Sequence, residues 1–426
     1  MDPMIYAIIL FAVTYVLMLT FSKYRPLIAL ASGAVFIFTG MLPINQVFGA
    51  LDFNVLLMIA GTMGLVQLFI ESKMPELLAD LIMEKVPNVR WAAVSLALFA
   101  GVISAFVDNV ATVLMIAPVA IEICKKLKTN PVPFIIGIAV SSNLQGAATL
   151  VGDTTAIMLG SALDMSFLDF FIYNGKLGMF FIVELGAILS AVILCYVFRK
   201  EKAPIPKTQS KTRVEDYVPT VLLLGVIVLL IGASFISKKP AVTNGLICCV
   251  LFAIGLVYNV IKKKNISAVV SPVKAIDFET IGLLVGLFLM IGGISNMGVI
   301  DALGNLLAGL GGNNPFLMYT IIVWASVVIS AFIDNIPYVA TMIPLIAVIS
   351  QKMGIDPTPL YFGLLTGATL GGNCTPIGAS ANITGIGILR KEGYEVKNSD
   401  FFKIGIPFTF AAVVPAYVII WLLFGV

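Results

Sequence analysis

Two Asp-Asn pairs stand at the centres of long apolar segments of this chain: Asp108-Asn109 in the first half and Asp334-Asn335 in the second. A carboxylate at the centre of an apolar membrane helix costs at least about 2.5–3.5 kcal/mol, and such residues are generally kept for ion binding or proton transfer. The simpler alternative is that each Asp caps a helix that begins at the pair, and one residue can do both. We predict that the pairs bind a coupling ion, either H⁺ or Na⁺, with Na⁺ held by Asp108, Asn109, Asp334 and Asn335.

Each half also contains a stretch in which Gly, Asn and Thr replace apolar residues, Ser141–Thr155 and Gly371–Asn382. Unwound backbone in such stretches exposes carbonyl groups that can coordinate Na⁺, and the helix N-termini that follow offer N–H groups to anions. Close helix packing is the alternative explanation for several of the glycines. The predicted binding residues, besides the two pairs, are Thr112, Asn143, Thr149, Gly152, Asp153, Thr154, Thr155, Asn373, Thr375, Ser380 and Asn382.

Asp153 gives the first half a second acid, which is expected to face Asp108 and to titrate with it as a coupled pair. Its counterpart in the second half is Ala379, so the site is predicted to be asymmetric. The predicted spans contain no Lys or Arg. Three acids without a fixed cation suit a cation, a proton or a neutral oxyacid better than a bare multivalent anion.

The missing residue types narrow the chemistry further. The chain has no His, so a proton must be carried by a carboxylate, and neither a Ser-His nor a Cys-His catalytic pair can form. The five Cys residues have no metal-ligand spacing, so no zinc site is predicted. The chain is therefore not expected to be an enzyme, and no cofactor other than the coupling ion is expected.

The composition indicates that lipid surrounds much of the chain. Hydrophobic residues make up 59% of the 426 residues and charged residues only 12%, whereas soluble domains carry roughly 25% charged residues. The net charge of +3 implies no nucleic-acid partner. The first residues lead directly into an apolar stretch without a basic region, which favours a first membrane helix over a signal peptide. An integral membrane protein with membrane lipid as its partner is predicted.

Twelve apolar segments are long enough to suggest membrane elements. Two of them are too long for one span and are predicted to be re-entrant helical hairpins that turn at the Asp-Asn pairs. Two others are predicted to be spans broken by unwound backbone, which is tolerated only where protein or a wet cavity surrounds it. The segments are 4–21, 26–42, 52–70, 91–123 (hairpin), 133–163 (broken), 178–198, 217–237, 241–261, 276–296, 315–350 (hairpin), 359–389 (broken) and 404–424.

The two halves of the chain repeat each other. Each half, 1–198 and 217–426, is predicted to hold five spans and one hairpin, joined by the linker 199–216. Because five is odd, the second repeat must be inverted, and the fold class is an all-α polytopic membrane protein with broken helices at the site. Ser104–Asn109 matches Ser330–Asn335 and Thr149–Gly152 matches Thr375–Gly378 at an offset of 226, while Asp52-Phe53 matches Asp277-Phe278 at 225.

The basic residues orient these repeats, because cytoplasmic loops are enriched in Lys and Arg. If the linker 199–216 is cytoplasmic, all but four of the 26 Lys and Arg residues fall on the cytoplasmic side, and both termini fall outside. The membrane is predicted to be the prokaryotic inner (plasma) membrane. The four exceptions are Lys176, Lys238, Lys239 and Lys352.

Inverted repeats with paired discontinuous elements are the architecture of secondary transporters. The two hairpins and two broken helices are predicted to move as one unit against a scaffold made of the remaining spans. The alternatives are a passive ion channel, which needs a continuous polar pore, and a structural or receptor bundle with Gly kinks.

Several motifs resemble those of the ion transporter superfamily with a citrate-transporter-like domain. This group includes arsenite efflux permeases, NhaD-type sodium/proton antiporters, the melanosomal P protein and divalent-anion/sodium symporters. The resemblance implies a homodimer in which each protomer has a scaffold and a moving domain with two hairpins, working by an elevator mechanism. The motifs are Ser104–Thr112 running on to Pro118, Gly146–Asp153, Gly371–Asn382, Glu392–Tyr394 and Asp400–Pro407.

Two departures from the family patterns bear on the substrate. The dicarboxylate symporters carry Ser-Asn-Thr at the hairpin tips, where this chain has Asp-Asn followed by Val110 or Ile336. The P-protein motif has Pro-Pro after Gly-Asp, where this chain has Thr154-Thr155, closer to the antiporters. The resemblance therefore implies an ion-coupled secondary transporter, with the substrate open between an arsenite-like oxyacid or small anion and Na⁺/H⁺ exchange.

Overall fold

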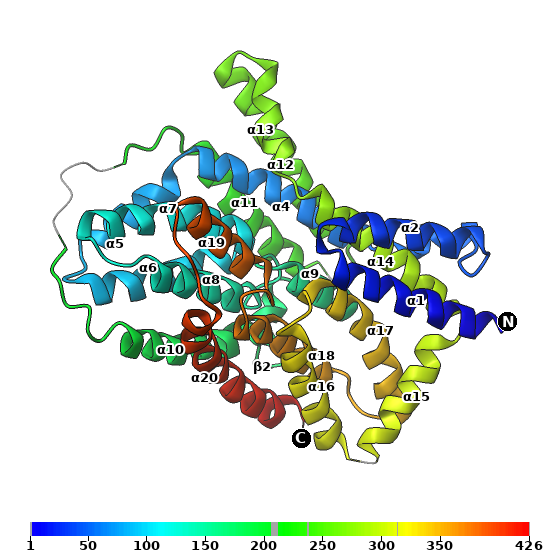
Figure 1. Ribbon diagram of the computed structural model, residues 1–426. Helices are drawn as coiled ribbons and strands as arrows, with labels where there is room; N and C mark the ends of the chain where they lie inside the picture. Colours follow the sequence, from blue (N-terminus) through cyan, green and yellow to red (C-terminus); the bar gives the residue numbers. More distant parts are fainter. Residues whose placement is uncertain (1, 206–211, 237, 313, 426) are drawn as a thin grey trace.

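The computed structural model describes residues 2–205, 212–236, 238–312 and 314–425, and this part of the chain is nearly all helical (Figure 1). The first half contains α1 (Pro3–Thr20), η1 (Ser22–Tyr24), α2 (Arg25–Phe38), α3 (Ile44–Ala50), α4 (Phe53–Glu71), α5 (Met74–Met83), α6 (Val89–Ser104), α7 (Asn109–Leu127), α8 (Val132–Gly146), α9 (Thr154–Ala162), η2 (Leu168–Phe170), the strands β1 (Ile172–Tyr173) and β2 (Lys176–Leu177), and α10 (Met179–Val197). The second half contains α11 (Val218–Ser234), α12 (Thr243–Lys263), η3 (Ile266–Val269), α13 (Val270–Lys274), α14 (Phe278–Asn296), α15 (Val299–Gly311), α16 (Pro315–Ser330), α17 (Asn335–Met353), α18 (Thr358–Leu365), η4 (Thr366–Leu370), η5 (Gly372–Cys374), α19 (Ser380–Lys391) and α20 (Asn398–Phe424).

Seven of the described helices are long and apolar enough to cross a membrane, and an eighth span is counted if α15 and α16, which meet at 115°, form one bent pair. The predicted breaks are all present. Helices α6 and α7 are separated at the first Asp-Asn pair, α16 and α17 at the second, and the two predicted broken spans are interrupted between α8 and α9 and between α18 and α19. The short helices α3, α5, α13 and α15 and the small β1–β2 hairpin are not predicted from the sequence.

The two halves correspond helix by helix, from α1–α10 to α11–α20, and they interlock. Helix α2 packs most extensively on α14, and α12 packs on α4. Since α2 corresponds to α12 and α4 to α14, each of these contacts is the repeat counterpart of the other. Glycines allow the close approach: a Cβ on Gly286 would lie 2.3 Å from the carbonyl carbon of Ala29, and one on Gly61 would lie 2.5 Å from that of Cys248. Contacts that correspond in this way are those of two repeats related by an approximate twofold axis, as the inverted-repeat prediction requires.

Helices α10 and α20 differ from their predicted assignment. They pack against each other and against α8, and α20 also contacts α18, η4 and η5. The scaffold prediction grouped these two spans with α1, α2, α4, α11, α12 and α14, which instead pack among themselves. Small residues bring α10 and α20 close to each other: a Cβ on Gly186 of α10 would lie 3.3 Å from Cα of Ala412 of α20. Packing places both helices with the hairpins and broken helices.

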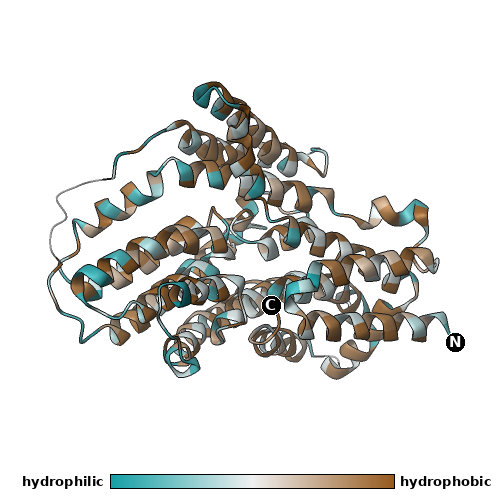
Figure 2. Cartoon of the chain, turned by 45° about the horizontal axis from the view of Figure 1, so that its top comes forward, coloured by the Kyte–Doolittle hydropathy of each residue, from teal (hydrophilic) through white to brown (hydrophobic). Residues whose placement is uncertain are grey.

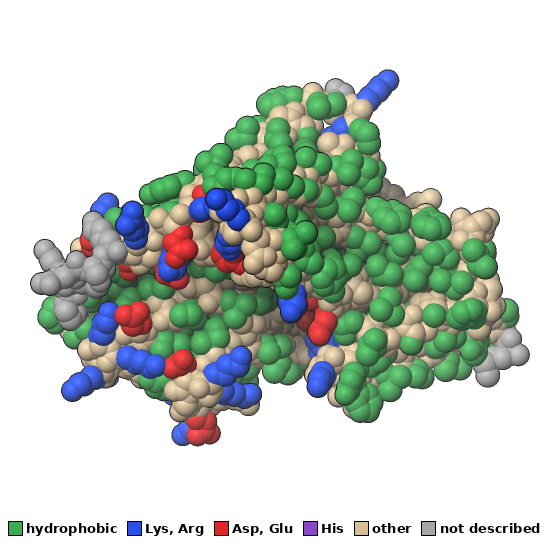
Figure 3. All heavy atoms as spheres, turned by 90° about the horizontal axis from the view of Figure 1, so that it is seen from above, with side chains coloured by type: hydrophobic (Ala, Val, Ile, Leu, Met, Phe, Trp, Pro, Cys, Tyr) green, Lys and Arg blue, Asp and Glu red, His purple; other side chains and the backbone are tan. Residues whose placement is uncertain are grey.

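Apolar residues, coloured brown in Figure 2, predominate along most of the helices, and many of their side chains are exposed. On α11 and α12 alone, Val221, Leu224, Val228, Val250 and Val257 are each more than half exposed. Exposed apolar patches of this extent are typical of surfaces that contact lipid rather than water. Lys, Arg, Asp and Glu gather instead toward one end of the molecule in the view from above (Figure 3).

The charged end joins loops that lie far apart in the sequence. Lys73 forms an ion pair with Glu215, at 2.6 Å, and Lys125 pairs with Glu392, at 2.5 Å. Along the linker, the Val89 N–H donates to the Ala203 carbonyl at 3.0 Å. The hydrogen bond between Lys73 and Glu215 raises the pKa of the lysine and lowers the pKa of the carboxyl. Several of the loops that the charge bias assigned to one side of the membrane therefore meet at one end of the fold.

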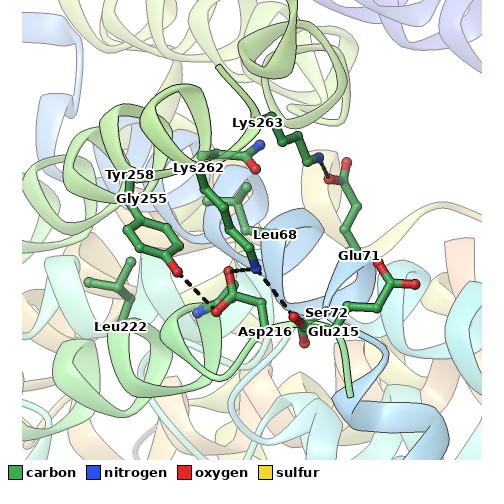
Figure 4. Close-up of a pocket in the computed structure, with 12 residues that line it drawn as sticks. Leu68, Glu71, Ser72, Glu215, Asp216, Leu222, Gly255, Tyr258, Lys262 and Lys263 are labelled. Atoms are coloured by element: carbon green, nitrogen blue, oxygen red, sulfur yellow. Dashed lines mark hydrogen bonds and ion pairs between the residues drawn. The ribbon is translucent and has the colours of Figure 1, made fainter. Parts of the chain in front are cut away.

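A cavity of about 230 Å³ lies at this end, between the last turns of α4 and α12 and the start of α11 (Figure 4). Lys262 reaches Asp216 at 2.8 Å and the Glu215 carbonyl at 3.2 Å, while Lys263 reaches Glu71 at 3.1 Å. Each of these charged side chains has a partner within the cavity wall. The cluster attaches the end of the linker to the helices of both repeats and lies apart from the Asp-Asn pairs.

The side of the membrane on which these loops lie stays a prediction, and two cysteines test it. In a version without the five native Cys residues, Cys at Lys207 and Cys near the C-terminus are expected to react with an impermeant thiol reagent from opposite sides. Lys207 and Lys211 lie outside the described residues, so Lys128 provides a second exposed position on the linker side. Reaction of the linker-side and C-terminal positions from the same side would contradict the orientation.

Candidate functional site

The two Asp residues of the Asp-Asn pairs both begin helices. The Asp108 carboxylate accepts hydrogen bonds from the N–H groups of Val110, at 3.0 Å, and Ala111, at 3.2 Å. The Asp334 carboxylate accepts one from the N–H of Ile336, at 3.1 Å. The capping alternative considered from the sequence is therefore correct for both residues, and it leaves carboxylate lone pairs available for a further partner.

The two broken spans end differently. In the first half, α8 ends at Gly146 and α9 begins after Asp153, whose carboxylate accepts from the Thr154 N–H at 2.7 Å. In the second half, α18 continues into the π-helical turn η4, a feature common at functional sites. Helix α19 then begins after Ala379, which offers no side-chain cap. Of the four helix N-termini at the breaks, three are capped by carboxylates and the fourth is not.

Backbone carbonyl groups converge beside Gly152. A Cβ at this position would lie 2.6 Å from the oxygen of Gly146 and 2.9 Å from the oxygens of Ser104 and Ala105. Only glycine allows the first hairpin tip and the first broken span to approach this closely. Asp108 and Asp153 line one small cavity together with Gly152, as the sequence led us to expect of the two acids.

The second half repeats this arrangement at Gly378. A Cβ there would lie 2.5 Å from the oxygen of Gly372, 2.7 Å from that of Ser330 and 2.9 Å from that of Ala331. These four residues are offset by 226 from their counterparts in the first half. The same cluster of three carbonyl groups therefore occurs once in each repeat.

Two threonines fix the hairpin tips to the broken spans. The Thr149 hydroxyl donates to the Ala105 carbonyl and accepts from the Val151 N–H at 3.4 Å. The Thr375 hydroxyl donates to the Ala331 carbonyl and accepts from the N–H of Ile377 at 3.3 Å. Both hydroxyls are used within the protein, so these predicted site residues position the carbonyl groups.

Buried amides connect the two halves at the centre. Asn109 Nδ2 donates to Asn143 Oδ1 at 3.0 Å, and Asn143 Nδ2 donates to Asn373 Oδ1 at 3.0 Å and to the Thr369 carbonyl at 2.7 Å. Asn373 in turn donates to the Val140 carbonyl at 2.9 Å. Asn109, Asn143 and Asn373 are at most 4% exposed. The chain of bonds runs from the first hairpin tip through both broken spans.

A second connection reaches the other hairpin tip through Asp153. Thr155 Oγ1 donates to Asp153 Oδ2 at 2.8 Å and lies 2.9 Å from Thr369 Oγ1. Asn335 Nδ2 also donates to Asp153 Oδ2, at 3.4 Å. Asp153 therefore contacts the hairpin tip of the opposite repeat as well as sharing a cavity with Asp108. No counterpart of this contact is possible at Ala379.

The prediction that the site has no fixed cation is wrong. Arg25 Nη1 lies 3.3 Å from Asp334 Oδ2, and the two side chains are 21% and 12% exposed. Arg25 is the first residue of α2, one position before the predicted span 26–42. Its long side chain therefore brings a fixed positive charge to the second hairpin tip, although Arg25 lies outside the predicted span. Ser380 Oγ approaches the same carboxylate oxygen at 3.4 Å.

Two other predicted residues donate hydrogen bonds to backbone carbonyl groups of their own half of the chain. The Thr112 hydroxyl donates to the Asp108 carbonyl in its own helix, at 3.0 Å. Asn382 Nδ2 donates to the carbonyls of Gly372 and Thr375, both at 3.1 Å, while its Oδ1 has no partner among the described residues. The sequence analysis missed Thr369, although it is the 226-offset counterpart of Asn143 and could have been found from it.

The interlocked repeats, the exposed apolar helices and the central breaks define a polytopic membrane transporter. A sequence model of the citrate transporter family, CitMHS, matches residues 15–367 and 246–426. The chain belongs to this family, which confirms the resemblance seen in the motifs and agrees with the expectation that it is not an enzyme.

Relatives agree with this assignment, and a solved structure shares the fold. An uncharacterized transporter of Mycobacterium tuberculosis is 29% identical over 435 residues, covering 98% of this chain and 97% of the relative. The 46 kDa membrane protein of Mycobacterium leprae is 30% identical over 425 residues, 98% of each chain. The human P protein is 26% identical over 433 residues, covering 84% of this chain but 52% of the P protein. The YdaH transporter of Alcanivorax borkumensis shares the fold, with a TM-score of 0.61 over 99% of this chain and 98% of that chain at 15% identity.

Proposed function

We propose that this chain is a secondary active transporter that couples the movement of a small anion or oxyacid to H⁺ or Na⁺. The observation that carries the proposal is the repeated cluster at Gly152 and Gly378. Each cluster brings three backbone carbonyl groups beside a hairpin-tip Asp-Asn pair. Carbonyl and carboxylate oxygens are the ligands that hard cations prefer.

The helix N-termini favour an anionic or oxyacid substrate close to these clusters. Helices α7, α9, α17 and α19 all begin at the breaks, and helix N-termini attract negative charge. Asp108, Asp153 and Asp334 already provide that charge at three of them. Helix α19 begins without an acidic cap of its own, and the Ser380 hydroxyl at its start lies 3.4 Å from Asp334 Oδ2. A neutral or singly charged oxyacid suits this centre, because a multivalent anion would be repelled by the three acids.

Na⁺/H⁺ exchange is the second candidate, and the three acids at the helix breaks favour it. A carboxylate that releases a proton when Na⁺ binds is sufficient for exchange and needs no anion. The arrangement at α19 favours the first candidate, because an exchanger has no need of an uncapped helix N-terminus.

The packing favours an elevator mechanism, with the moving unit formed by α6–α10 and α16–α20. Hydrogen bonds between the buried amides tie the hairpin tips and broken spans together, so they would move as one body. If the linker side is cytoplasmic, the ion pair with Arg25 places the second hairpin tip near the cytoplasmic ends of α1 and α2. Such a position is that of a moving unit displaced toward the cytoplasm. A homodimer held by the scaffold helices, in a prokaryotic plasma membrane, would suit this mechanism.

Uptake by purified protein in liposomes tests the function. We expect accumulation of arsenite or another neutral or singly charged oxyacid against its own gradient when a pH or sodium gradient is imposed, because coupling transfers the free energy of the ion. Citrate is included as a multivalent anion, and we expect no accumulation of it. Sulfate and Na⁺ complete the panel, and protein-free liposomes are the control.

The outcomes separate the alternatives. Movement that only equalises concentrations would indicate a passive channel, and sodium flux driven by pH without any anion would indicate exchange. A second structure in the opposite state should show both hairpin tips at a changed depth relative to α1 and α2. Tips that stay at one depth would contradict the elevator mechanism.

A further inference from the structure

Arg25 contacts the second hairpin tip from outside the proposed moving unit. It begins α2, whose packing partners are α14 and α1. Its Nη1 lies 3.3 Å from Asp334 Oδ2, and its Nε donates to the Met18 carbonyl, at 3.2 Å. Met18 lies in the last turn of α1, where carbonyl groups favour a cation. The guanidinium is therefore held by the α1–α2 turn and points at a residue of the other unit.

Among the residues that the structure describes, only the second hairpin tip has such a partner. Gly61 and Gly286 are counterparts in the two repeats, so their contact partners, Cys248 of α12 and Ala29 of α2, are counterparts as well. In this alignment of α2 with α12, Arg25 corresponds to Asn244, the second residue of α12. Asp108 faces Ile59, Thr62 and Met63 of α4 instead. No ion pair joins Asp108 to a basic side chain in the described ranges. The positive charge of Arg25 is thus present in only one of the two repeats, and the symmetry between the repeats does not explain it.

The surroundings of the pair make it an interface between the two units. Tyr15 of α1 donates to the Pro337 carbonyl at 2.8 Å and contacts the hydroxyl of Thr341 on α17. Tyr15, Arg25, Asp334 and Pro337 line one small cavity. A charged pair that is mostly removed from water is strong when intact, and loss of one partner leaves a costly unpaired charge.

We propose that Arg25 is a tethered cation that occupies Asp334 while the coupling ion is absent and holds the second hairpin against the α1–α2 turn. A mobile cation that binds Asp334 displaces the guanidinium and releases the hairpin. Arg25 is then a positioning residue that ties movement to ion binding. This inference rests on the proposed ion coupling and adds a residue that the sequence analysis placed outside the site.

Two measurements on purified full-length protein test it. The first is the Na⁺ concentration that gives half of the thermal stabilisation, with choline replacing Na⁺ at constant ionic strength. The second is the reaction rate of a cysteine introduced as Thr341→Cys, in a version without native cysteines and in sodium-free buffer. Arg25→Gln removes the tethered charge, Arg25→Lys keeps it, and Lys23→Gln removes an exposed charge from the same turn.

Arg25→Gln is expected to lower the half-saturating Na⁺ concentration about tenfold or more, because an intramolecular competitor is gone. The Thr341→Cys side chain should react several-fold faster, because the hairpin is no longer held. Lys23→Gln should match the parent in both measurements, and Arg25→Lys should lie between. Asp334→Asn should raise labelling as far as Arg25→Gln does, and the double variant no further, because the two residues act as one pair.

Equal labelling rates in Arg25→Gln and Lys23→Gln would overturn the inference, whether or not Na⁺ stabilises the parent. Additive effects of Arg25→Gln and Asp334→Asn would also overturn it, since the residues would then act independently. A parent that responds to neither Na⁺ nor a pH gradient would instead argue against the proposed ion coupling, and the labelling result would still decide the role of Arg25.

Discussion

Replacement of Asp108 by Asn is expected to reduce gradient-driven uptake to the level of protein-free liposomes while the protein still folds. Asn and Asp are nearly equal as helix caps, so the new Asn side chain can keep the two hydrogen bonds to the start of α7. The substitution should therefore lower the free energy of unfolding by less than about 1 kcal/mol. The carboxamide, however, cannot exchange a proton for a cation. Uptake measured against pH and sodium concentration, beside thermal unfolding of the same variant, separates these two effects.

Asp334→Asn is the matched comparison for this prediction. Its defect should be weaker or of a different kind, because Asp334 is already paired with Arg25 and its half has Ala379 in place of a second acid. If Asp108→Asn transports with the pH and sodium dependence of the parent, Asp108 acts only as a cap and the coupling site lies elsewhere.

Gly378→Ala is expected to reduce gradient-driven uptake as much as Asp108→Asn does, for a steric reason. The new Cβ would lie 2.5–2.9 Å from three backbone oxygens, none of which belongs to a flexible side chain. The hairpin tip must then move away from the broken span, and overpacking of this kind costs about 1–3 kcal/mol. A displacement of about 1 Å in a preorganised site can cost about 10²-fold in rate. Gradient-driven uptake and stabilisation by Na⁺ should both be lost, and Gly152→Ala should act in the same way.

Gly387→Ala is the control in the same part of the fold. Gly387 lies in α19, and a Cβ there would meet no atom within 4 Å. Alanine is favoured over glycine in a helix, so this variant should be as stable as the parent or slightly more stable. Normal uptake by Gly378→Ala would show that the carbonyl cluster is not needed for transport.

The sequence predicted the fold well because membrane-spanning elements need long apolar segments, which are easily recognised in a sequence. Apolar length and polar interruptions located the breaks beside Asp108 and Asp334, since a chain in lipid can leave a helix only where other groups satisfy its backbone. The offset of 226 between repeats also predicted equivalent positions. The short helices α3, α5, α13 and α15 escaped prediction, because they lie between spans and are too short for the length criterion.

The site was less predictable because it depends on contacts between distant elements. The sequence places Arg25 at the end of a span, and only folding brings it to Asp334, 309 residues later. The contact of Asp153 with Asn335 joins opposite repeats in the same way. Spacing along one repeat could not show that Thr149 and Thr375 use their hydroxyls on the hairpin-tip carbonyls. The roles of the predicted ion-binding residues stay predictions.

The exchange of partners between repeats has a consequence for how the protein is made. Helices α2 and α4 leave the ribosome well before their main partners α14 and α12, which begin only at Phe278 and Thr243. Until then the surfaces that carry Ala29 and Gly61 must be covered by lipid or by the insertion machinery. The first half therefore enters the membrane as an incomplete body, and it cannot finish folding until α12 and α14 of the second half have been translated.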